Sequence, residues 1–177
     1  MNKNKIIFSL FLFACLLYAS GIKDRAFEII NKNYNSPKIE IEKFQLNKSL
    51  KEKIELEVRQ RFYQDYIYVY KIKIDDKEEG FAFIDNVLGK SMPITFMVIF
   101  DKKGDIKSSA ILKYREPYGG AVSSEDWQSQ FKGKNYKSSY SVGDEISAIS
   151  GATISVNSVS MGIKKLAILF SHIKNDL

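Results

Sequence analysis

Cysteine and histidine are almost missing from this sequence, which has one of each, Cys15 and His172. Iron–sulfur, haem and structural zinc sites need several thiolate or imidazole ligands, so this chain cannot build one alone. A Ser/His/Asp or Cys/His catalytic arrangement is also unsupported, because His172 stands near the C-terminus without an evident partner. Any redox role must therefore depend on an organic cofactor.

Nucleic-acid motifs and arginine-rich stretches are missing too, although the net charge is +6. The Lys residues alternate with Glu, as in Lys48–Arg59, which is typical of a solvated helix face. The charge therefore predicts no nucleic-acid partner, and at most a weak preference for an anionic membrane surface. With 177 residues, 45% of them hydrophobic, the chain is long enough for one packed domain and a small appendage.

The N-terminus has the pattern of an export signal. Met1–Lys5 carries two Lys and no acid, and Ile6–Ala19 is apolar apart from Ser9. The apolar run is shorter than the ~20 residues of a comfortable membrane span. Three interpretations stay open: a cleaved signal peptide, a retained short anchor, or lipidation at Cys15. Each predicts an exported domain on the periplasmic or cell-envelope face of the cytoplasmic membrane.

Hydrophobic periodicity predicts a single α+β domain, an antiparallel β-meander packed with helices behind the signal or anchor. Helices are expected over Lys23–Lys32 and over Ser49–Arg59, the latter with Ser49 and Glu52 as a capping box. A short helix capped by Ser123 carries Trp127 and Phe131 on one face. The expected strands are Tyr66–Ile74, Phe81–Leu88, Ile94–Phe100 and Ile106–Tyr114, joined by short turns.

The last helix has one apolar face, and its expected core positions are Val156, Val159, Ile163, Leu166, Ala167 and Phe170. The alternating Tyr-rich face of the strand Tyr66–Ile74 is also assigned to the core. We divide the chain into 1–21 (signal or anchor), 22–79 (N-terminal helices and first strand) and 80–172 (the domain that carries the chemistry).

Ser150-Gly151-Ala152-Thr153 stands immediately before this last helix. Small residues at a helix N-terminus leave free backbone N–H groups beside the positive end of the dipole, which suits a phosphate. Thr153 offers a hydroxyl at the same place. A plain cap and turn is the alternative interpretation. No base lies near Thr153 in the sequence, so a modification of its hydroxyl would need another protein.

These four residues, followed by Ile154-Ser155 and an amphipathic helix, resemble the FMN-binding domain family. That family includes the G subunit of the Rnf electron-transport complex, the C subunit of sodium-pumping NADH:quinone oxidoreductase, and stand-alone members. Gly89–Thr95, Arg115–Gly120 and Trp127–Lys134 also resemble stand-alone members, so the resemblance covers roughly residues 80–169.

The resemblance implies FMN in phosphoester linkage to Thr153, installed from FAD by a flavin transferase. It implies a membrane-associated, extracytoplasmic electron-transfer flavoprotein with membrane redox partners. One position departs from the motif: Ser147 stands six residues before Thr153, where an acid is usual. Asp144 and Glu145 are close but out of register.

The resemblance also implies a set of site residues. Ser150, Gly151 and Ala152 lie beside the phosphate, and the expected neighbours of the flavin ring are Tyr118, Gly119, Gly120 and Trp127. Trp127 has a second interpretation, as a core partner of Phe131. Glu116 forms either a structural salt bridge or a hydrogen bond to the flavin. No catalytic side chain and no metal ligand are assigned.

Two other functions stay open from the sequence. One is a flavin reductase that acts directly on a small acceptor, which needs a proton donor such as Glu116 or Asp126. The other is an FMN-free envelope module that keeps the fold, with Ser147 as the sign of a lost attachment site. A redox carrier subunit is the leading hypothesis.

Overall fold

The computed structural model describes residues 21–177, so the expectations for the signal, the anchor and Cys15 lie outside the described residues. Within the described part, we find no helix that is both long enough and apolar enough to cross a membrane.

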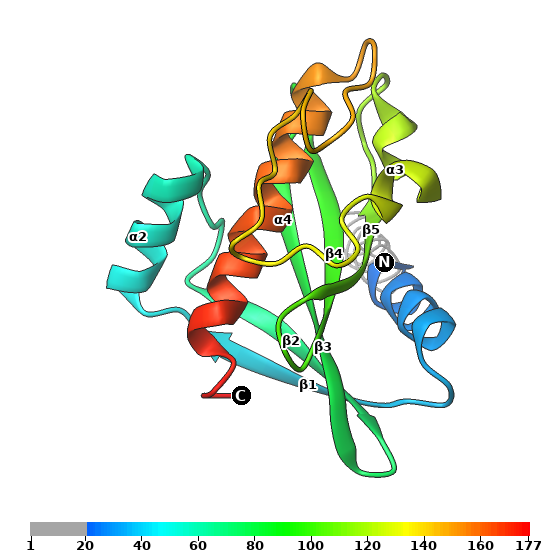
Figure 1. Cartoon of the computed structure of the whole chain (residues 1–177), viewed down its shortest axis with the longest axis vertical. Helices are drawn as coiled ribbons and strands as arrows, with labels where there is room; N and C mark the ends of the chain where they lie inside the picture. Colours follow the sequence, from blue (N-terminus) through cyan, green and yellow to red (C-terminus); the bar gives the residue numbers. More distant parts are fainter. Residues whose placement is uncertain (1–20) are drawn as a thin grey trace, which may run out of the picture.

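The fold is α+β, as predicted, and is built on a five-stranded antiparallel sheet whose strands follow one another in chain order (Figure 1). Four predicted strands are confirmed with small shifts at their ends, and one was missed. The strands are β1 (Lys38–Gln45), β2 (Tyr66–Ile74), β3 (Lys77–Leu88), β4 (Pro93–Asp101) and β5 (Ile106–Lys113).

The missed strand, β1, pairs with β2 along its whole length. Cross-strand ion pairs join the two strands: Lys73 Nζ lies 2.6 Å from Glu40, and Lys71 Nζ lies 2.8 Å from Glu42. Strand β3 begins four residues earlier than expected, because the β2–β3 turn consists of only Asp75 and Asp76. Both have positive φ, at 50° and 59°, as a tight two-residue hairpin turn requires.

Residues 21–33 are helical, which confirms the first predicted helix. The other helices are α2 (Lys48–Val58), the 3-10 helix η1 (Gly120–Ser123), α3 (Glu125–Ser129) and α4 (Thr153–Ile173).

Two predicted caps are wrong by one or two residues. The cap of α2 is Asn47, whose Oδ1 accepts from the N–H groups of Ser49 and Leu50, so the capping box at Ser49 does not form. The cap of α3 is Ser124, whose hydroxyl accepts from the N–H of Trp127.

Both faces of the sheet are covered, which explains why β4 is buried at almost every position. One face packs on α4, where the rings of Phe100 and Phe170 stack with centroids 5.0 Å apart. The other face packs on the helix at residues 21–33, through Ala26 and Ile30. The Tyr-rich face of β2 is therefore core only in part: Tyr70 is buried, but Tyr68 is 46% exposed.

Helix α4 approaches the sheet closely at Gly162. A Cβ at this position would lie 2.6 Å from Val87 Cγ1 and 2.9 Å from Phe96 Cζ. Both distances are shorter than any ordinary carbon contact, so a glycine is needed where the helix crosses β3 and β4. The six core positions predicted for α4 are all buried.

Gly162→Ala should lower the free energy of unfolding by about 1–3 kcal/mol, because overpacking outweighs the helix propensity that alanine gains. Urea denaturation measures the change. His172→Ala, at an exposed position of the same helix, is the control and should change stability by less than about 0.5 kcal/mol. A more stable Gly162→Ala protein would contradict the close contact.

A buried ion pair also joins α4 to the sheet. Lys165 is fully buried, and its Nζ lies 2.9 Å from Asp85 Oδ2 and donates to the backbone carbonyl of Arg61 at 2.8 Å. Its charge also sits over the ring of Phe62, 4.6 Å from the centroid. Burial raises the pKa of Asp85, and the neighbouring ammonium group of Lys165 opposes that rise.

Lys165→Met should destabilise the protein by about 3–5 kcal/mol, because it leaves the Asp85 carboxyl buried without its counter-ion. The double variant Asp85→Asn/Lys165→Met should recover most of this loss, since no unpaired charge remains. Urea denaturation of both variants provides the test. A double variant as unstable as the single one would show that the ion pair is not the cause.

Candidate functional site

A groove of about 720 Å³ lies at the N-terminal end of α4. Three segments far apart in the sequence line it: residues 90–92 between β3 and β4, residues 116–118 after β5, and residues 151–155 at the start of α4. The sequence-predicted residues Thr153, Gly151, Ala152, Tyr118 and Glu116 therefore meet in one groove. Ser150 and Gly119 flank it in the chain.

The start of α4 has unused hydrogen-bond donors. Its N-cap, Ala152, has no side chain that can cap the helix. Among the described residues, no acceptor is found for the backbone N–H groups of Thr153, Ile154 and Ser155. The side chain of Thr153 is exposed, and its hydroxyl has no partner in the described part of the chain. This end of a 21-residue helix can thus receive an anion.

Two glycines shape the backbone here. Gly151 has φ +76°, and nothing lies within 4 Å of where its Cβ would be, so it makes the turn and leaves space open. Gly119 has φ +84°, and a Cβ there would lie 2.7 Å from the hydroxyl of Tyr114. That hydroxyl donates to the carbonyl of Tyr118 and lies 2.9 Å from Ser155 Oγ. Tyr114 therefore fastens the loop after β5 to the first turn of α4.

Glu116 fastens the same loop to the β3–β4 turn. Its Oε1 accepts from the N–H of Ser91 at 2.6 Å and from the N–H of Met92 at 2.9 Å. These two hydrogen bonds, assisted by the positive charge of Lys90, lower the pKa of Glu116 below its ordinary value of 4.5. The contacts of Glu116 are hydrogen bonds to the backbone, and they hold one wall of the groove to another.

Trp127 does not line the groove. It is 6% exposed and packs edge-on against Phe131, with ring centroids 5.2 Å apart. Its Nε1 donates to the carbonyl of Ser147 at 2.8 Å, and Gln130 Oε1 accepts from the N–H of Ser147 at 2.8 Å. Trp127 is thus a core residue that also fixes the chain three residues before Ser150. Gly120, at the start of η1, is likewise not among the lining residues.

Sequence reasoning did not assign several groove residues, namely Lys90, Ser91, Met92, Pro117, Ile154 and Ser155. The stretch Gly89–Thr95 carried part of the family resemblance, but as an isolated turn it gave no sign of ligand contact. Lys90 adds a cation to the groove. Met92, Tyr118 and Ile154 are exposed hydrophobic side chains, with Tyr118 83% exposed. Grouped in one groove, they form the kind of apolar surface that is typical of ligand-binding grooves.

A family model described as the FMN-binding domain matches residues 89–167. This range includes all three segments that line the groove. Residues 89–167 therefore match an FMN-binding domain, and this match indicates FMN as the cofactor. A search of curated proteins found no match.

The groove suits this cofactor. Free N–H groups, the hydroxyl of Thr153 and the cation of Lys90 are phosphate-binding groups, and Met92, Tyr118 and Ile154 provide apolar surface for an aromatic ring. When bound, FMN supplies the redox chemistry of its isoalloxazine ring. The protein supplies position and partial shelter from water.

The lowered pKa of Glu116 leads to a pH prediction. The contact stabilises the folded state only while Glu116 is ionised, so it is fully present above pH 4.5 and is lost as the pH falls through the lowered pKa. In NMR titrations, the amide signals of Ser91 and Met92 should shift with a midpoint below 4.5.

Glu116→Gln should abolish this titration and speed the hydrogen exchange of the Ser91 and Met92 amides. Glu125→Gln is the matched control, because Glu125 also has a lowered pKa but pairs with Lys32. Unchanged amide signals in Glu116→Gln would mean that the carboxylate does not hold the turn.

Proposed function

We propose that this protein is an extracytoplasmic, membrane-associated electron-transfer flavoprotein that carries FMN through a phosphoester to Thr153. The supporting observation is the exposed hydroxyl of Thr153, at the first position of a helix whose first three N–H groups have no acceptor among residues 21–177. An attached phosphate would occupy a position where these donors and the helix dipole favour negative charge.

Attachment needs a second protein under this proposal. No described residue hydrogen-bonds to the hydroxyl of Thr153, so nothing in residues 21–177 activates it. A flavin transferase would supply the base. The bond from Thr153 Oγ1 to phosphorus forms, the pyrophosphate bond of FAD breaks, and AMP leaves; the base takes the hydroxyl proton. Ser147, where the transferase motif usually has an acid, lies on the exposed surface.

A carrier role is favoured over a flavin reductase by the state of Glu116. A reductase that protonates a small acceptor needs an acid with a proton to give at neutral pH. Glu116 is the carboxyl group of this groove, and it is held ionised by two backbone N–H groups. The groove is also bordered by exposed Tyr118, so a bound ring would remain accessible to a protein donor or acceptor.

The location and partners are part of the same proposal. The apolar run Ile6–Ala19 would export the chain and, if retained, hold it at the membrane. Membrane redox proteins would then be the natural electron donor and acceptor. A tether would also prevent loss of the flavin outside the cytoplasm.

Thr153→Ala should abolish covalent flavin, because it removes the only atom through which the phosphoester can form at this position. The full chain is coexpressed with a flavin transferase, and flavin fluorescence is read in a denaturing gel beside the intact mass. The wild-type protein should gain the mass of FMN less water. Thr153→Ser retains a hydroxyl and Ser150→Ala removes a neighbouring one, so both should keep covalent flavin.

Each other result identifies an alternative. Wild-type protein that binds FMN but loses it on denaturation would contradict the phosphoester and retain the flavoprotein. Wild-type protein without any flavin would favour the FMN-free envelope module. Ser147→Asp restores the acid of the motif. If this variant gains covalent flavin and the wild-type protein does not, Ser147 is the reason that the wild-type protein is not flavinylated.

A further inference from the structure

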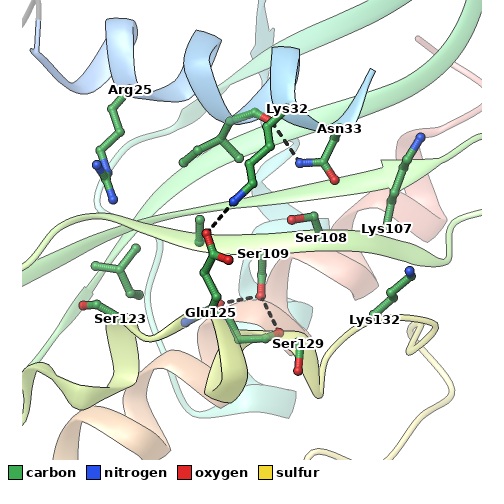
Figure 2. A pocket seen from close by; sticks show the side chains of 14 residues that line it. Arg25, Lys32, Asn33, Lys107, Ser108, Ser109, Ser123, Glu125, Ser129 and Lys132 are labelled. Carbon is green, nitrogen blue, oxygen red and sulfur yellow. Dashed lines mark hydrogen bonds and ion pairs between the residues drawn. The ribbon is translucent and has the colours of Figure 1, made fainter. Parts of the chain in front are cut away.

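A second hollow, of about 340 Å³, follows strand β5 between the helix at residues 21–33 and α3 (Figure 2). We call it the β5 groove. Five consecutive residues of the strand, 107–111, line it. Successive side chains of a strand point to opposite faces, so a hollow that touches all five must lie along the edge of the sheet.

The outer edge of β5 is open along this groove. The strand order ends at β5, and the chain that follows pairs only with its first residue, through Ile106, Gly133 and Lys134. In the described part of the chain, no backbone hydrogen bond reaches the outer edge over Ser108–Ile111. An edge of this kind presents unpaired donors and acceptors that can pair with another strand.

The groove is strongly positive. Arg25, Lys32, Lys107 and Lys132 line it, against a single acid, Glu125, which pairs with Lys32 across the middle. Figure 2 shows Arg25 at one end and Lys107 and Lys132 at the other. Because these cations are spread along the groove, they match an elongated anion better than a compact one. The opposite edge of the sheet differs, since the acids of β1 are paired with lysines.

We propose that the β5 groove binds an extended acidic peptide segment of a partner protein, which adds to the sheet as a sixth strand beside β5. Backbone pairing with β5 supplies affinity, and the cations on both walls select acidic side chains. The small side chains of Ser108, Ser109 and Ala110 leave room for the added strand. This inference is independent of flavin attachment at Thr153.

The experiment uses the full chain and a fluorescent eight-residue peptide of alternating Glu and Val. Anisotropy titration measures its affinity, and hydrogen exchange measures protection of the Ser108–Ile111 amides. Arg25→Glu/Lys132→Glu should weaken binding on the order of tenfold, since both side chains are exposed groove cations. Lys48→Glu/Lys53→Glu, on α2, makes the same change in net charge and should leave the affinity within about twofold.

A second peptide has the same charges but carries an N-methyl group on every backbone nitrogen, so neither of its edges can donate hydrogen bonds to β5. Its binding should be lost, and only the unmodified peptide should protect Ser108–Ile111. Equal binding of the two peptides would overturn strand addition and leave charge attraction alone. An equal loss of peptide affinity in both charge variants would show that the β5 groove is not the binding site. Binding of phosphatidylserine vesicles but of neither peptide would replace the peptide by a lipid surface.

Discussion

The packing of α4 on the sheet is the constraint on which the site depends. The helix begins at Thr153, inside the groove, and its buried face extends along β3 and β4 to Phe170. Gly162 permits the close approach, and the buried pair of Lys165 and Asp85 adds a directional contact further along. A hydrophobic face alone would let the helix slide or rotate, whereas a close glycine contact and an ion pair fix its depth and register. The N–H groups at its start are thereby held in position.

Around that helix end, the groove is assembled by polar contacts between loops. Tyr114 joins the loop after β5 to α4, and Glu116 joins the same loop to the β3–β4 turn. Neither contact is deeply buried, so the strength of these hydrogen bonds depends on their short distances and good alignment. The β3–β4 turn, the loop after β5 and the first turn of α4 are therefore joined into one connected lining of the groove. The groove is therefore preorganised: its donors and its apolar surface are already in place in the absence of a ligand.

The strongly periodic elements could be read from the sequence, and the contacts between loops could not. Helix α4 and strand β2 follow directly from their apolar spacing. Strand β1 was missed because Lys43 interrupts the apolar alternation that begins with Ile39 and Ile41. Its pairing with β2 exists only in the folded chain and leaves no local signal in the sequence. The caps were misplaced because polar neighbours compete and packing decides between them. Family resemblance supplied Thr153 and FMN; the groove residues Lys90–Met92 meet α4 only in the folded chain.

Helix α3 is only five residues long, yet it is a wall shared by two parts of the surface. One side holds the segment that leads to Thr153, through the hydrogen bonds of Trp127 and Gln130 to Ser147. The other side, with Glu125 and Gln128, borders the β5 groove. A displacement of α3 would therefore change both the segment before Thr153 and the β5 groove. If both proposals hold, a peptide bound along β5 would press on the same helical turn that positions the chain before Thr153, so binding at the sheet edge would alter the flavin site.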